Sequence, residues 1–184
     1  MQRAYPALAL ILALTACGSA EPAPVDPKLA DPAGEGLGQA KPAAPAGPAV
    51  AAMDPTRLGN PCLLDSGAVG TALGFAVEKS EPETMGAMSG CTYHGKDMSL
   101  RLNFIVHDPV YFAQATEMTR KTRPGDKRDL AGDPDKAWIQ QEGSGTPILH
   151  YYRQNVEVEL VPMVVGGADP KAIEAALLKL PRVP

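Results

Sequence analysis

The feature that most constrains the fold is a ten-residue segment, 98–107, in which apolar and polar side chains alternate. Its first set is Met98, Leu100, Leu102, Phe104 and Val106. A period of two is typical of a half-buried strand, because successive side chains of a strand point to opposite faces of its sheet. A second alternation begins at Val156, where valine and leucine are separated by Glu157 and Glu159. Both segments predict long strands of an antiparallel sheet.

Each alternating strand belongs to a predicted hairpin that is followed by a helix. The first hairpin joins 91–94 to 98–107, and the second joins 148–153 to 156–164. An Asp-Pro pair follows each hairpin, at Asp108 and at Asp169, and this pair is typical of a helix start. Segments 92–100 and 150–158 align without a gap, which suggests a weak internal repeat. The shared physics of hairpins could also produce this likeness without duplication.

The remaining segments complete an α+β prediction. A helix is expected over 66–73, because Asp65 can cap its start and Gly74 can end it. A short strand is expected over 136–141, and loops over 78–90 and 123–135. The predicted fold is an antiparallel sheet of four to six strands with about three helices packed on one face.

The N-terminus has the parts of a secretory signal peptide, in residues 1–16. Arg3 supplies the basic charge, and the apolar segment 7–14 is shorter than the ~20 residues of a transmembrane helix. Leu14, Ala16 and Cys17 then stand at positions −3, −1 and +1 of a cleavage point. This pattern resembles the lipobox of bacterial lipoproteins. The alternative is an ordinary signal peptide in which Cys17 is incidental.

The lipobox resemblance implies a location as well as a modification. The Cys17 thiol would take a diacylglyceryl group, and its freed amine could take a further fatty acid such as palmitate. Two or three acyl chains hold a protein more firmly than one, because each buried CH₂ adds ~0.8 kcal/mol. The protein would then be exported and lipid-anchored to the cell envelope. Glycine at position 18, in place of the aspartate that favours inner-membrane retention, favours the outer membrane where the host has two.

Composition divides the rest of the chain into a linker and one domain. Residues 17–55 are rich in Pro, Ala and Gly and hold no aromatic residue, so we expect a disordered spacer. Residues 56–184 are long enough for a single domain. The formal net charge of the chain is −4, and this lack of a basic surplus argues against nucleic acid as a partner.

The cysteine count supports the same interpretation. The chain has three cysteines, and lipidation of Cys17 would leave Cys62 and Cys91 as an even pair in an oxidising compartment. We therefore predict a structural disulfide between them. The rival hypothesis, a reactive thiol pair, lacks the C-x-x-C spacing.

The domain also resembles a family. Residues 61–64 (Pro-Cys-Leu-Leu), then Leu73-Gly74, then 91–93 (Cys-Thr-Tyr) are similar to small uncharacterised bacterial lipoproteins best known from actinobacteria. Segment 132–138 is similar to their Gly-Asp-x-Ala segment, although two extra residues precede its Ala. The resemblance implies the same disulfide and an α+β fold. That family has no agreed activity, so no catalytic residue is implied.

No motif of catalysis, metal binding or cofactor binding is present in the sequence. The histidines at 94, 107 and 150 have no third ligand at a recognisable spacing, and we expect solvated strand histidines. The sequence therefore predicts no cofactor and no metal, and a non-catalytic module that binds an unknown envelope protein or small ligand. The candidate binding surface is Arg101, His107, Tyr151 and Tyr152. Alternatives are a periplasmic enzyme with a loop-built site around Arg101 and His107, and an inhibitor or sensor that uses an exposed sheet face near Tyr151 and Tyr152.

Overall fold

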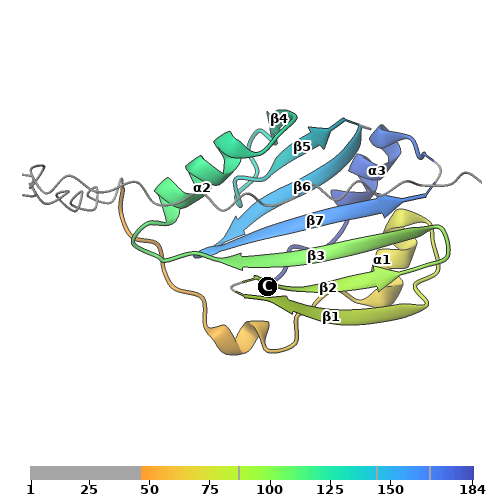
Figure 1. Cartoon of the computed structure of the whole chain (residues 1–184), viewed down its shortest axis with the longest axis horizontal. Helices are drawn as coiled ribbons and strands as arrows, with labels where there is room; N and C mark the ends of the chain where they lie inside the picture. Colours follow the sequence, from red (N-terminus) through yellow and green to blue (C-terminus); the bar gives the residue numbers. More distant parts are fainter. Residues whose placement is uncertain (1–46, 87, 144, 166) are drawn as a thin grey trace, which may run out of the picture. The chain divides into compact units, whose positions relative to one another are not determined.

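The computed structural model describes residues 47–86, 88–143, 145–165 and 167–184 (Figure 1). The predicted signal peptide, Cys17 and most of the predicted linker therefore lie outside the described residues. Within the described part, no helix combines the length and the apolar composition that a membrane crossing requires.

One antiparallel sheet of seven strands forms the centre of the domain. Its strands are β1 (Lys79–Met85), β2 (Met88–His94), β3 (Met98–Val106), β4 (Asp126–Asp129), β5 (Trp138–Glu142), β6 (Thr146–Arg153) and β7 (Val156–Val164). Their spatial order is β1-β2-β3-β7-β6-β5-β4. The two predicted hairpins, β2–β3 and β6–β7, thus meet at the middle of the sheet, where Leu102 lies opposite Leu160.

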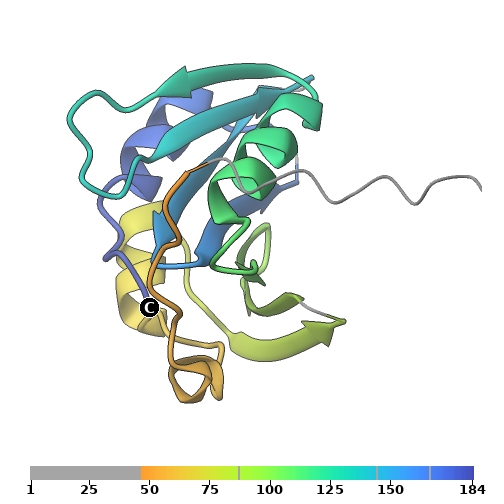
Figure 2. The ribbon, with the colours of Figure 1, turned by 90° about the vertical axis from the view of Figure 1, so that its left-hand side faces the viewer.

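Helices cover both faces of the sheet. The helices α1 (Ser66–Leu73) and α3 (Pro170–Leu177) pack together on one face, and α2 (Phe112–Thr122) lies on the other (Figure 2). A short 3-10 turn, η1 (Pro55–Leu58), precedes α1. Asp65 and Asp169 cap α1 and α3 as predicted, each accepting a backbone N–H with its side chain.

The α+β prediction is confirmed, with three corrections of detail. Asp108-Pro109 does not start a helix, since α2 begins at Phe112 after Tyr111, which makes no side-chain cap bond. The sheet has seven strands where four to six were predicted, because the predicted loops 78–90 and 123–135 contain β1 and β4. Both are edge strands of mainly polar sequence, and an edge strand has one neighbour and no need of an apolar pattern. The helices also do not share one face, since α2 crosses to the side opposite α1 and α3.

The apolar core fills the face beneath α1 and α3, and we call this side the apolar face. Its buried side chains include Leu100, Leu102, Phe104, Leu149, Tyr151, Val158, Leu160, Ile173 and Leu177. The predicted disulfide is confirmed, since Cys62 is bonded to Cys91 with their Cα atoms 5.0 Å apart. Tyr93 stabilises the chain next to this disulfide. Its hydroxyl accepts a hydrogen bond from Leu64 N at 2.9 Å and donates one to Leu64 O at 3.0 Å.

Packed structure begins before the predicted domain start at residue 56. Val50 N donates to Pro109 O at 3.1 Å, and Met53 N donates to Asn155 Oδ1 at 2.6 Å. Met53 is buried in the core. The C-terminal end of the predicted linker is therefore part of the folded domain.

Candidate functional site

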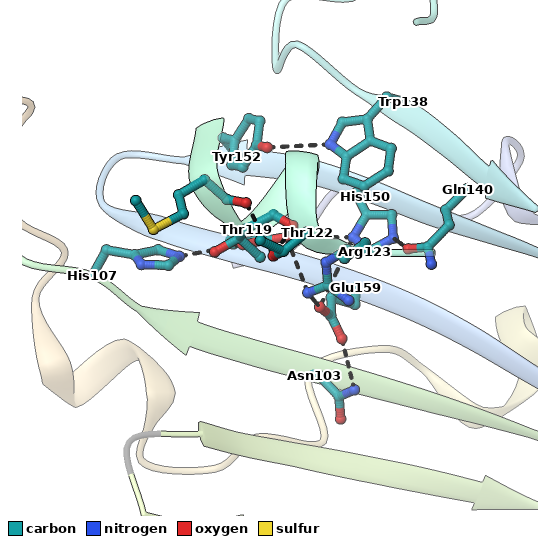
Figure 3. Close-up of polar contacts among 12 residues, drawn as sticks. Asn103, His107, Thr119, Thr122, Arg123, Trp138, Gln140, His150, Tyr152 and Glu159 are labelled. Carbon is teal, nitrogen blue, oxygen red and sulfur yellow. Dashed lines mark hydrogen bonds and ion pairs between the residues drawn. The ribbon is translucent and has the colours of Figure 1, made fainter. Parts of the chain in front are cut away.

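The face beneath α2 buries polar side chains, and we call this cluster the polar network. Its central members are Glu157 and Glu159 of β7, His150 of β6, Gln140 of β5 and Asn103 of β3 (Figure 3 labels all but Glu157). His150 and Gln140 are wholly buried, and Glu157 and Glu159 are 1% and 5% exposed. Glutamates are almost never so buried unless they are paired, so each must be satisfied by a specific partner.

Glu157 is held by three cationic or ionisable groups. His107 Nε2 lies 3.2 Å from its Oε2, while Arg123 Nη2 and His150 Nδ1 each lie 3.4 Å from its Oε1. Burial by itself would raise the pKa of the Glu157 carboxyl. The hydrogen bond with His107 and the charge of Arg123 act against burial, and the pKa is lowered to about 2. Glu157 is therefore an ionised carboxylate at neutral pH.

Glu159 is satisfied in the same manner. Asn103 Nδ2 donates to its Oε2 at 3.1 Å, and Arg123 donates to its Oε1. Arg123 follows α2 directly as its C-cap residue, so the end of this helix delivers one guanidinium to both glutamates.

Hydrogen bonding to Gln140 fixes the tautomer of His150. The Gln140 amide nitrogen donates to Pro124 O and to Glu142 Oε1, so its Oε1 accepts from His150 Nε2 at 3.0 Å. The imidazole also stacks on Trp138, with ring centroids 3.9 Å apart. Burial lowers the pKa of His150, which favours the neutral ring. In that tautomer Nδ1 carries a lone pair, and Nδ1 has no hydrogen-bond partner.

A groove of about 680 Å³ lies beside the polar network, between α2 and the connection from β4 to β5. Its lining includes Phe112, Ala113, Leu130, Ala137 and Tyr152. The Tyr152 hydroxyl accepts from Trp138 Nε1 at 3.2 Å, and Trp138 in turn stacks on His150. Contacts from Tyr152 through Trp138 to His150 thus connect the groove to the polar network.

The four residues of the predicted binding surface are distributed over both faces. Arg101 pairs with Glu83 at 3.5 Å, whereas His107 pairs with Glu157. Arg101 and His107 therefore belong to two separate ion pairs. Tyr151 is wholly buried in the apolar face, where its hydroxyl accepts from Val183 N at 2.9 Å. Tyr152 lines the groove on the opposite face.

The prediction of solvated histidines holds for one of the three. His94 has a side chain 40% exposed and lies 3.0 Å from Glu81. The prediction is wrong for His150, which is wholly buried. His107 is also mostly buried, with a side chain only 12% exposed. Strand alternation shows which side a residue faces, but it does not show that α2 covers that side.

The cluster of His150, Glu157 and Glu159 was not among the candidate residues from the sequence. The alternating glutamates of 156–160 were visible as a polar strand side. Their burial depends on β7 being a central strand, paired with β3 and β6, and on Arg123 arriving from α2. Neither fact is a local property of the sequence.

Comparison with known proteins gives no relative: no family model, no curated protein and no solved structure matches this chain. Function must therefore be argued from the groove and the network themselves.

Proposed function

We propose that the protein is an exported lipoprotein, anchored through Cys17, whose domain binds a small, mainly apolar molecule in the groove beside α2. The role is binding and not catalysis. The groove is the observation that carries the binding part of this proposal. The sequence pattern that ends at Cys17 carries the anchor.

The size and lining of the groove suit a small ligand. Sites for small molecules commonly have about 300–1,000 Å³ and are mostly apolar, with a few polar groups that fix orientation. The groove of about 680 Å³ combines aromatic and aliphatic walls with the charged side chains of Arg120 and Lys136. Arg120 is itself held, by Asp129 at 2.7 Å and by the Trp138 ring at 5.1 Å. The groove therefore has a fixed polar edge beside an apolar floor.

The position of the groove agrees with an anchored protein. Pro48 and Val50 line part of the groove, and Val50 N donates a hydrogen bond to Pro109 O, shortly before α2. The segment that leads back to Cys17 thus starts at the groove. A spacer of Pro and Ala residues would then give the binding site reach from the membrane surface.

A fluorescent amphiphile tests the groove. Titration of the full-length chain with 1-anilinonaphthalene-8-sulfonate should give saturable binding, and Ala113→Trp should weaken it at least tenfold by filling the groove. Ala175→Trp is the matched control, because Ala175 is likewise an exposed helix alanine but lies on α3. Equal affinity in both variants would show that the dye binds elsewhere, and the groove proposal would fail.

The anchor needs its own test. Mass spectrometry of the mature N-terminus should find a diacylglyceryl-modified Cys17, and Cys17→Ser should release the protein from membranes. Removal of 20–46 should leave the domain folded, because the Pro- and Ala-rich composition of this segment predicts a spacer. An unmodified Cys17 would overturn the anchor and leave the groove proposal untouched.

A further inference from the structure

Three ligand atoms of the kind that hold metal ions converge beneath α2. Nδ1 of His150 and one carboxylate oxygen from each of Glu157 and Glu159 all lie within 4.8 Å of one another. All three side chains are buried.

Each of the three side chains is oriented by a separate partner on its far side. Gln140 binds Nε2 of His150 at 3.0 Å, which leaves Nδ1 toward the glutamates. His107 and Asn103 contact Oε2 of Glu157 and Oε2 of Glu159, and both Oε1 atoms lie toward His150 Nδ1. Figure 3 shows the contact between Asn103 and Glu159. Metal-binding histidines almost always donate their other ring N–H to an oxygen, and ligating carboxylates are hydrogen-bonded in turn. The polar network has this arrangement around all three atoms.

Among the three proposed ligand atoms, His150 Nδ1 is the one that the described structure leaves without a hydrogen-bond partner. It is wholly buried and has no hydrogen-bond partner, and the two atoms it faces are carboxylate oxygens at 3.4 and 3.9 Å. A nitrogen lone pair directed at two carboxylates is unfavourable, unless a cation lies between them. The burial of this unpartnered nitrogen is a separate observation from the acidic pair itself.

The spacing suits a small divalent cation. Zn–N and Zn–O bonds of ~2.0–2.2 Å in a tetrahedral site place neighbouring ligand atoms roughly 3.4 Å apart. The observed separations from Nδ1 are 3.4 Å to Glu157 Oε1 and 3.9 Å to Glu159 Oε1. Closing the second separation by a few tenths of an ångström completes two edges of a tetrahedron.

Arg123 now contacts the two oxygens that such a cation would bind. Its Nη2 contacts Oε1 of Glu157 and Oε1 of Glu159. The side chain reaches in from the end of α2 and is 22% exposed, so it borders solvent. With Arg123 in place the two carboxylates and the guanidinium sum to one negative charge, whereas a divalent cation would neutralise both carboxylates.

We propose that His150, Glu157 and Glu159 form a binding site for a divalent transition-metal cation of the Zn²⁺ class, and that Arg123 is the competing cation that leaves when the metal enters. Imidazole with carboxylates is a ligand set used by zinc and its neighbours in the first transition row. This site goes beyond the proposed function, and it does not depend on what fills the groove.

Titration of the full-length, tag-free chain with Co²⁺ and Zn²⁺ tests the site. Cys17→Ser in every sample removes the one thiol outside the disulfide. We expect one ion per chain, with the visible absorption of Co²⁺ bound by nitrogen and oxygen ligands. Glu159→Gln and His150→Asn should weaken binding by roughly a hundredfold, at or beyond the upper end of losses seen on removing outer-shell partners. Arg123→Gln should tighten binding, because the competitor is gone.

The matched control is His94→Asn. His94 also belongs to a histidine–glutamate pair, with Glu81, and is 40% exposed, so its loss should leave the affinity unchanged. Binding that survives both Glu159→Gln and His150→Asn would overturn the proposal. So would the absence of binding in both the wild-type chain and Arg123→Gln.

Thermal melting separates a metal site from a purely structural ion pair. Arg123→Gln leaves two buried carboxylates without their counter-ion and should lower the Tm, and Zn²⁺ should restore it. A lowered Tm that Zn²⁺ does not restore would show Arg123 to be a structural counter-ion only, and the metal proposal would fail. Glu159→Gln keeps the side-chain volume, so it remains informative if His150→Asn does not fold. Ala113→Trp should bind metal normally, which keeps this test distinct from that of the groove.

Discussion

The two faces of the sheet are both covered by helices, yet they are held together by different forces. The apolar face beneath α1 and α3 is closed by leucine, valine and aromatic side chains and by the Cys62–Cys91 bridge. The face beneath α2 buries Glu157, Glu159 and His150. An apolar core tolerates substitutions that keep its volume and pattern, whereas a buried charge depends on one particular partner. The polar network is therefore the less forgiving side, and the side able to bind ions.

The largest expected effect comes from removing the counter-ion of the polar network. With a metal chelator present, Arg123→Met should lower the free energy of unfolding by ~3–5 kcal/mol, because two buried carboxylates lose the guanidinium that they share. Urea unfolding measures it. Arg128→Met is the control: Arg128 also pairs with a glutamate, but its side chain is 57% exposed, and its loss should cost less than ~1 kcal/mol. Equal losses would erase the contrast between the faces.

Loss of the disulfide tests the apolar face at its corner. Replacing both Cys62 and Cys91 with Ala should cost about 3–4 kcal/mol, since the bridge closes a loop with a sequence separation of 29. The same urea experiment applies. The affinity of the groove for the dye should not change, because both cysteines lie on the opposite side from α2. A change in dye affinity would mean that the faces are coupled.

A smaller loss is expected at Tyr93, also on the apolar face. Tyr93→Phe should cost ~1–3 kcal/mol, because the backbone N–H and C=O of Leu64 lose their partner. Burial, partly offset by the hydrogen bond with Leu64, raises the pKa of Tyr93 above its usual 10. A group with a raised folded pKa contributes stability below its unfolded pKa and loses it as pH rises. Tyr93→Phe should therefore flatten the decline in stability above pH ~10, measured by unfolding at stepped alkaline pH.

The smallest effect is expected on the part of the polar side that α2 does not cover. Arg101 and Glu83 are both 38% exposed and lie 3.5 Å apart. Arg101→Ala should change stability by less than ~1 kcal/mol, since exposed ion pairs are weak and screened by salt. Unfolding with and without added salt measures this. A large loss would mean that burial does not decide which charges matter here.

The long strands and both capped helices could be predicted from the sequence because their signals are local. Alternation at 98–107 and 156–160, Asp-Pro at 169–170, and Asp65 with Gly74 act over a few residues each. The disulfide followed from parity once Cys17 was assigned to lipid. The edge strands β1 and β4 were missed because Lys79–Met85 and Asp126–Asp129 are mainly polar. The polar network was missed because it requires the order of the strands, which only tertiary pairing sets.

The backbone hydrogen bond between Val50 and Pro109 has a mechanical consequence if Cys17 carries lipid. Among the described residues, a pull between the membrane and the domain would then reach Pro48 and Val50 first, at the groove and near the start of α2. Such a force would act first on the helix that bears Phe112 and Ala113 and ends at Thr122, directly before Arg123. The Cys62–Cys91 corner lies on the opposite face of the sheet from α2. Tension on the tether would thus act on the groove and the polar network before it could threaten the core.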